Sequence, residues 1–173
     1  MFYNLFPNLE SLMTMTEAAP SLVITPEQLR AHWQGHRALT RRIIAAFPED
    51  QLFTFSVGGM RPFSEMAVEL IRMAAPSVRG LVTGEWTRGE AVTAGSRDEI
   101  LRLWDESTEE IDTLWPRIAP TKFQETMMAF GQYEGPVHSL LMYIIDNEIH
   151  HRAQGYVYLR ALGVEPAPFW ERA

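Results

Sequence analysis

Apolar residues recur at every third or fourth position in four segments of this sequence, and each segment is bounded by residues that start or stop helices. Thr25-Pro26-Glu27-Gln28 places a capping Thr before Pro at the first helical position and Gln at the third. This pattern predicts a helix that begins here and is stopped by Pro48. Its apolar stripe runs from Leu29 through Trp33 to Phe47, at the spacing of one helix face.

Similar signals predict three further helices. Ser64 is the expected cap of the second helix, in which Pro76 predicts a kink or a break. Ser96-Arg97-Asp98-Glu99 has the pattern of a capping box and predicts the third helix. Gly135-Pro136 is expected to open the last helix, which should end at Gly163.

The connections between these helices also carry structural signals. Residues 48–63 are too apolar for a free linker and predict an ordered segment with extended character. Residues 123–133 read as one or two short strands that close near Gly131. The expected fold is therefore all-α, a four-helix bundle with long crossover connections and minor β or irregular pieces. We expect residues 21–173 to form this single domain and residues 1–20 to be an N-terminal extension or packing arm.

Composition excludes several classes of function. The 173 residues include 15 Lys and Arg against 22 Asp and Glu, a net charge of −7, which argues against a broad nucleic-acid-binding surface. The densest basic group, three arginines within residues 37–42, is interpreted as a solvated or salt-bridged helix face. There is no Cys, so disulfides, thiolate ligands and a Cys nucleophile are excluded. No apolar run is long enough for a membrane span, and no signal peptide is read, so we expect no membrane association and a cytoplasmic location.

Four polar residues fall on or beside the apolar stripes, where a bundle builds metal and ligand sites. Asn147 and His151 are one turn apart on one face of the last helix, with Glu148 beside them. Two potential ligands at this spacing can reach one ion. His36 occupies a stripe position on the first helix, and Glu69 lies at the edge of the stripe on the second. We therefore take His36, Glu69, Asn147 and His151 as the candidate metal site.

Other interpretations of these residues stay open. A lone His on an apolar stripe, such as His36, is more often a hydrogen-bonded core residue than a ligand, and Glu69 can equally be solvated. His150 is expected to be exposed, and His32 and His138 to be structural. Because burying an unpaired charge is costly, polar residues on inward faces of different helices should share a partner. The pattern alone thus predicts either a metal site or a polar core, and it names no reaction.

Three segments resemble a known family. Residues 146–164, DNEIHHRAQGYVYLRALGV, resemble the last-helix signature of the DinB-like (YfiT-like) metalloprotein superfamily, H-x-x-x-H-R-G-Q followed by a Tyr- and Leu-rich helix that ends in L-G. Residues 61–70 resemble the entry to that family's second helix, and residues 48–52 resemble its P-E-E-x-L segment. The resemblance spans about residues 25–168, most of the chain.

This resemblance implies a four-helix bundle, commonly dimeric, with a divalent metal held by three His residues. Characterised relatives include enzymes that use low-molecular-weight thiols in transfer and isomerisation reactions. The present sequence departs from the pattern, because Asn147 and Glu69 stand at two of the three ligand positions and only His151 is retained. Ala153 also replaces the Gly of the H-R-G-Q motif. An inward His36 could replace a lost ligand, and such an N/O set suits Zn, Ni, Fe or Mn.

Three hypotheses follow for function. The first is a divalent-metal-dependent enzyme of the DinB-like class, in which the metal polarises a bound water or an exogenous thiol, since the chain has no Cys. The second is a non-catalytic small-molecule-binding or stress-response protein that lacks a functional metal. The third is a purely structural homodimer. A homodimer is expected in each case, and a small-molecule ligand in the first two, without a nucleic-acid or membrane partner.

Overall fold

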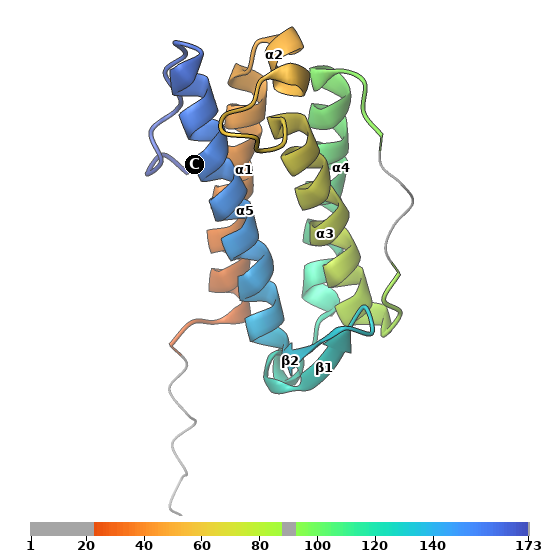
Figure 1. Ribbon diagram of the computed structural model, residues 1–173. Helices are drawn as coiled ribbons and strands as arrows, with labels where there is room; N and C mark the ends of the chain where they lie inside the picture. The colour runs from red at the N-terminus through yellow and green to blue at the C-terminus, as the bar shows by residue number, and fades with distance from the viewer. Residues whose placement is uncertain (1–22, 88–92, 173) are drawn as a thin grey trace, which may run out of the picture.

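Four long helices form a bundle in the computed structural model, which describes residues 23–87 and 93–172 (Figure 1). These helices are α1 (Pro26–Ala46), α3 (Phe63–Thr83), α4 (Arg97–Leu114) and α5 (Val137–Ala161). Helix α1 packs against α4 and α5, and α3 packs against the same two helices from the other side. The expected all-α bundle is confirmed. None of the helices in the described ranges has the length and apolar character needed to cross a membrane. The expected arm, residues 1–20, lies outside the described residues.

Most helix boundaries follow the sequence signals. Thr25 accepts a hydrogen bond from the backbone N–H of Gln28, whose side chain accepts one from Thr25 in return, so the predicted capping box is formed. Ser96 caps α4 by accepting from the backbone N–H of Glu99. The expected cap at Ser64 is wrong, because Pro62 is at the cap position, two residues earlier, and Ser64 is buried inside α3.

One connection and one helix differ from expectation. Glu49–Thr54 forms a short helix, α2, rather than extended chain, with Leu52 buried against the bundle. Pro76 does not break α3, which continues to Thr83 and ends at Gly84 in the left-handed conformation, with φ 79°. Buried neighbours on both sides of Pro76 hold the helix together across the missing N–H.

A β-hairpin precedes α5 and lies at one end of the bundle (Figure 1). Two short 3₁₀ turns, η2 (Trp115–Arg117) and η3 (Pro120–Gln124), lead from α4 into it. Strands β1 (Thr126–Ala129) and β2 (Tyr133–Pro136) pair antiparallel, with Ala129 opposite Tyr133. The turn between them takes positive φ at Phe130 and Gly131, which confirms the predicted closure near Gly131.

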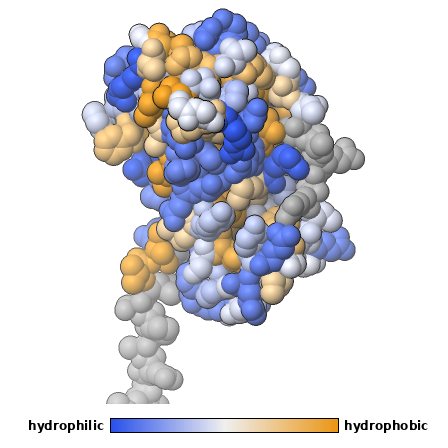
Figure 2. Space-filling model, in the orientation of Figure 1, coloured by the Kyte–Doolittle hydropathy of each residue, from blue (hydrophilic) through white to orange (hydrophobic). Residues whose placement is uncertain are grey.

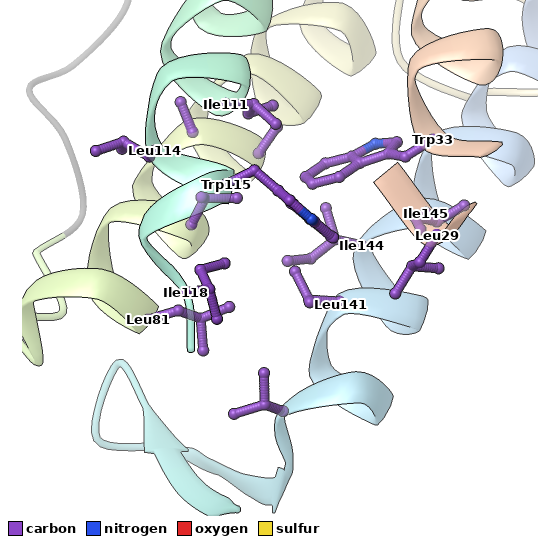
Figure 3. Packing of buried hydrophobic residues seen from close by; sticks show 14 of the residues in the cluster. Leu29, Trp33, Leu81, Ile111, Leu114, Trp115, Ile118, Leu141, Ile144 and Ile145 are labelled. Carbon is purple, nitrogen blue, oxygen red and sulfur yellow. The ribbon is translucent and has the colours of Figure 1, made fainter. Parts of the chain in front are cut away.

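The core consists of two apolar clusters, one at each end of the bundle. In the cluster nearer the hairpin, Trp115 meets Trp33 edge to face, with ring centroids 6.0 Å apart (Figure 3). Trp115 also contacts Phe123. In the other, Phe47 stacks on Phe63 at 4.9 Å. Between the clusters lies a layer of buried polar side chains from α1, α4 and α5: His36, Arg37, Thr40, Ser107, Glu148, His151 and Arg152.

Candidate functional site

Three of the four sequence-predicted site residues meet where His151 of the polar layer faces α3. His151 Nε2 of α5 lies 3.2 Å from Oε1 of Glu69 on α3, and Asn147 Nδ2 lies 3.4 Å from the same oxygen. Asn147 also contacts the sulfur of Met73 at 3.4 Å. The i, i+4 spacing of Asn147 and His151 therefore turns both side chains of α5 towards α3, at the level of Glu69.

A second contact indicates which nitrogen of the His151 ring carries a proton. Its Nδ1 lies 2.9 Å from Oε1 of Gln154, one turn further along α5. The amide nitrogen of Gln154 faces His150 at 3.3 Å, which supports this orientation of the amide. Because Gln154 Oε1 can only accept, Nδ1 of His151 carries the proton that it donates. In a neutral ring, Nε2 then has no proton and points its lone pair at Glu69.

Arg61 provides the counter-charge for Glu69. Arg61 lies just before α3, and its guanidinium is 2.7 Å from Oε2 of Glu69. Partial burial acts to raise the pKa of Glu69, but the hydrogen bond and positive charge of Arg61 outweigh it, with a further contribution from Asn147, and the pKa is lowered. Glu69 is therefore a carboxylate at neutral pH. One of its oxygens is bound to Arg61 and the other faces His151.

His36 does not join this cluster, contrary to expectation. Arg152 Nη2 donates to His36 Nδ1 at 2.9 Å, while Nε2 lies 3.2 Å from His32 Nε2 and 3.3 Å from the guanidinium of Arg172. Burial, followed by the charges of Arg152 and Arg172, lowers the pKa of His36 to about 4. Each ring nitrogen of His36 thus faces a guanidinium, Nδ1 that of Arg152 and Nε2 that of Arg172, and neither is open to a metal ion. The position of His36 corresponds to the alternative interpretation, a hydrogen-bonded core residue.

Glu148 lies on the α1 side of the layer rather than with Asn147. It is fully buried and accepts hydrogen bonds from Thr40 at 2.7 Å and from the Trp33 indole at 3.1 Å. Arg37 Nη1 lies 3.9 Å from its carboxylate, and Arg37 also donates to Thr108 on α4. Burial raises the pKa of Glu148, and the charge of Arg37 opposes this effect.

The sequence interpretation missed Arg37 and Arg152. The sequence predicts a solvated or salt-bridged face at Arg37, but this side chain is buried, and its guanidinium lies 4.2 Å from the centroid of the Trp104 ring. Its spacing was a usable signal, because Arg37 follows Trp33 by four residues and so continues the apolar stripe. Arg152 is buried next to His151 and donates to the His36 carbonyl as well as to its ring.

A cleft of about 1280 Å³ opens beside Glu69, between α3, α5 and the hairpin. Its walls are mainly apolar and include Val68, Met73, Trp86, Phe130, Tyr143 and Ile144. The indole of Trp86 lies against the backbone of α3 at Gly80, where a Cβ would come within 2.5 Å of the ring, and meets Phe130 edge to face. Arg61 and Glu69 line the cleft where it reaches the polar layer. Figure 2 shows this face, with hydrophilic residues across its middle and apolar atoms visible in the hollow between the helices.

The arrangement gives the His151 cluster access to the cleft through Glu69, whose side chain is 33% exposed, against 9% for His151. Within residues 23–87 and 93–172, no group of three or more His, Cys, Asp or Glu side chains is placed to hold a metal ion. A three-ligand site would therefore need the amide oxygen of Asn147 together with Glu69 and His151.

Comparison with known proteins agrees with these observations. Residues 88–173 match the model of the DinB family. A crystal structure of a DinB-like protein from Bacillus subtilis superposes with a TM-score of 0.69 at 16% identity, covering 84% of this chain and 99% of that one. A DinB-like protein from Bacillus cereus gives 0.66 at 17% identity, covering 86% and 100%. About half of this chain is thus similar to the DinB family, and the whole bundle has the fold of the DinB-like proteins. No curated protein matches this chain.

The last-helix motif of this chain has a distinct role for each polar residue. His151 faces α3 and Glu69, Arg152 faces α1 and holds His36, and Gln154 fixes the ring of His151. The helix carries Ala153, which is exposed, where the motif has Gly. Close packing is required instead at Gly155, where a Cβ would lie 2.7 Å from the Phe63 ring.

Proposed function

We propose that this chain binds a divalent metal ion at Glu69, Asn147 and His151, and that the ion acts on a small molecule held in the adjacent cleft. One observation carries the proposal. Nε2 of His151 faces Oε1 of Glu69 at 3.2 Å, while Gln154 accepts the proton of Nδ1. Two acceptor lone pairs at this distance repel each other unless a cation lies between them. That cation is either a proton, which makes His151 an imidazolium, or a metal ion.

The chemistry of the donor set supports a metal. One imidazole nitrogen, one carboxylate oxygen and one amide oxygen form an N/O set suited to Zn, Ni, Fe or Mn. The amide oxygen of Asn147 becomes available when the two ends of its amide exchange places. The contact between Gln154 and Nδ1 is the outer-shell interaction that commonly fixes the ring of a metal-binding His.

Such an ion supplies one kind of chemistry, a lowered pKa of a water or thiol bound to it. Because the chain has no Cys, a thiol would be exogenous and of low molecular weight, as in a thiol-cosubstrate transferase or isomerase. The apolar walls of the cleft would hold the body of an organic substrate, and Glu69 lies where the cleft meets the polar layer.

A second candidate function is favoured by Arg61. Its ion pair with Glu69, at 2.7 Å, already supplies a positive charge to the carboxylate and competes with a metal for it. In that case the layer is a polar core without metal, and the chain is a non-catalytic small-molecule-binding or stress-response protein.

Metal content and metal titration of matched variants test the proposal. The protein is purified without a metal-affinity tag, analysed for bound metal, stripped, and titrated by calorimetry with Zn²⁺, Ni²⁺, Fe²⁺ and Mn²⁺. We expect about one ion per chain. His151→Ala should weaken binding by at least about 100-fold, because even outer-shell partners contribute about 10- to 100-fold. Arg61→Ala should strengthen binding, because it frees Glu69 from a competing cation.

The control is His32→Ala, which removes the exposed member of the His32–His36 pair outside the cleft. Unchanged affinity in this variant, together with loss in His151→Ala, supports the proposal. Loss of binding in His32→Ala instead would place the metal on the surface of α1. If neither metal content nor titration shows binding, the second candidate is the correct one.

A further inference from the structure

Two aromatic side chains are built into the end of the cleft beside the hairpin. The indole of Trp86 lies on α3 at Gly80, where any larger residue would collide with the ring, since a Cβ would come within 2.5 Å of it. Phe130 meets this indole edge to face, with 5.2 Å between the ring centroids. The backbone of Phe130 has a positive φ of 53°, which is strained for a residue with a bulky side chain. A close approach at a glycine and a strained backbone thus both position flat apolar surfaces on the wall of the cleft.

These two rings and the proposed metal site lie towards opposite ends of one face of α3. Gly80 follows Glu69 by eleven residues, close to three helical turns, so the two residues lie on the same side of the helix. Their separation along the helix axis is about 16 Å. Met73 and Ser77 line the cleft between them. A molecule that reaches from the rings to Glu69 is therefore elongated, with a flat apolar group at one end.

Arg72 supplies a positive charge beside this path. It lines the cleft three residues after Glu69, and its side chain is exposed. Most arginines in the described part of the chain pair with a carboxylate, but Glu69 pairs with Arg61 and not with Arg72. Val68 and Pro76, four residues before and after Arg72, offer no partner for an ion pair along the helix. Within the described ranges, the guanidinium of Arg72 therefore has neither an ion pair nor a hydrogen bond.

We propose that the cleft binds an elongated organic acid, whose flat apolar end lies against Trp86 and Phe130 and whose carboxylate binds Arg72. A guanidinium presents a fork of N–H donors that matches the two oxygens of a carboxylate. Because Glu69 lies one turn before Arg72, the atoms beside this carboxylate are the ones nearest the proposed metal site. The inference names the substrate class of that site and so rests on the proposed function.

Two further carboxylates line the cleft and favour a ligand of the opposite charge. Glu65 lies in the first turn of α3, where the helix dipole stabilises a negative charge, and Glu134 lies on β2. As seen from the two rings, Glu65 lies beyond Glu69, so a ligand that ends at Glu69 does not reach it. Arg72 lies between Glu69 and the rings, along the path of the ligand. This position favours the acid, and an amine with the same apolar body is the competing ligand.

Three probes that share one apolar body and differ in the head group test the charge: phenylhexanoate, phenylhexanol and phenylhexylamine. Each is titrated by calorimetry into the chain as purified and again after metal removal. The acid should bind at least about 10-fold more tightly than the alcohol in both cases, because it gains hydrogen bonds to a charged group. Arg72→Gln should abolish this preference and leave the affinity for the alcohol unchanged. The matched control is Arg117→Gln, which removes an exposed arginine outside the cleft and should keep the preference.

Phe130→Gly tests the aromatic end of the cleft. Glycine adopts a positive φ without strain, so the variant should fold, with a melting temperature that is unchanged or higher. The acid and the alcohol should both bind about 3- to 10-fold more weakly, because a ring contact is lost. This pair of results separates a ligand-binding role for the ring from a purely structural one, which would lower the melting temperature.

Four results would overturn the proposal. They are an amine that binds as tightly as the acid, a preference for the acid that persists in Arg72→Gln, unchanged affinities in Phe130→Gly, and a preference that is lost with the metal, which would place the carboxylate on the ion. A chain that binds no metal but keeps an Arg72-dependent preference for the acid would support this ligand class and refute the proposed metal site alone.

Discussion

Replacement of Glu148 by Ala should destabilise the protein more than any other single carboxylate change in the bundle. Glu148 is fully buried, accepts hydrogen bonds from Thr40 and Trp33, and is the nearest carboxylate to the buried guanidinium of Arg37. Its removal leaves a buried hydroxyl and a buried indole N–H without this acceptor. It also leaves the positive charges of Arg37 and Arg152 in the interior without their counter-ion.

The expected loss can be worked out from these contacts. Breaking a buried ion pair by removing one partner costs about 3–5 kcal/mol. A buried donor left without an acceptor costs about 1–3 kcal/mol, and this cost partly overlaps with the first. We therefore expect the free energy of unfolding to fall by about 4 kcal/mol, a large part of the 5–15 kcal/mol typical of a folded domain. The melting temperature should fall by about 8–16 °C.

Urea unfolding followed by circular dichroism measures this change. Glu109→Ala, an exposed carboxylate on α4, is the matched control and should stay within about 0.5 kcal/mol of the unmodified chain. A double-mutant cycle with Arg37→Met and Glu148→Met should give a loss smaller than the sum of the single losses by at least about 1 kcal/mol. A fall below about 1 kcal/mol for Glu148→Ala, or an additive cycle, would refute the interpretation that the polar layer is a coupled charge network.

Three further predictions follow from the same structure. Because folding lowers the pKa of His36 from 6.5 to about 4, the unfolded chain takes up this proton first, so stability should fall as pH drops from 6.5 to 4. His36→Gln should flatten that part of the urea-unfolding profile by at most about 3 kcal/mol. Gly155→Ala should lower the free energy of unfolding by about 1–3 kcal/mol, because its Cβ would lie 2.7 Å from the Phe63 ring, whereas Gly95→Ala meets nothing within 4 Å and should be nearly neutral. The chain should not retard DNA at about 150 mM salt, since Arg37 is buried and Arg41 and Arg42 are paired with Asp105 and Glu171; a shift with sub-micromolar protein would contradict this.

Local signals predicted the fold well because helix boundaries depend on neighbouring residues. The Thr25 capping box and the turn at Gly131 are each formed within a few residues of chain, so their sequence patterns are sufficient. The segment 49–54 was misread as extended because its helix depends on burying Leu52 against the bundle, which local sequence does not encode. Pro76 misled for a similar reason, since tertiary packing holds α3 through it.

The candidate site was only partly predictable. Asn147 and His151 share a face of one helix, so their proximity follows from spacing alone, and Glu69 at a stripe edge could reach them. The role of His36 as a core residue depends on Arg152, which lies 116 residues away in sequence and donates a hydrogen bond to Nδ1 of His36. Arg37 was read as a surface residue because arginine is mostly exposed. Only its position one turn after Trp33 indicated otherwise.

The two i, i+4 pairs on α5 explain how the polar layer and the cleft site depend on each other. Glu148 and Arg152 face α1, and each follows by one residue a side chain of the other pair, Asn147 or His151. One residue corresponds to a rotation of about 100° around the helix. The bonds of Glu148 and Arg152 to α1 therefore fix the rotation of α5 that turns Asn147 and His151 towards Glu69. The side chains that face α3 can therefore differ from the three His residues that the resemblance implies and still be aimed at the cleft, because the residues that set their direction lie on the opposite side of the helix.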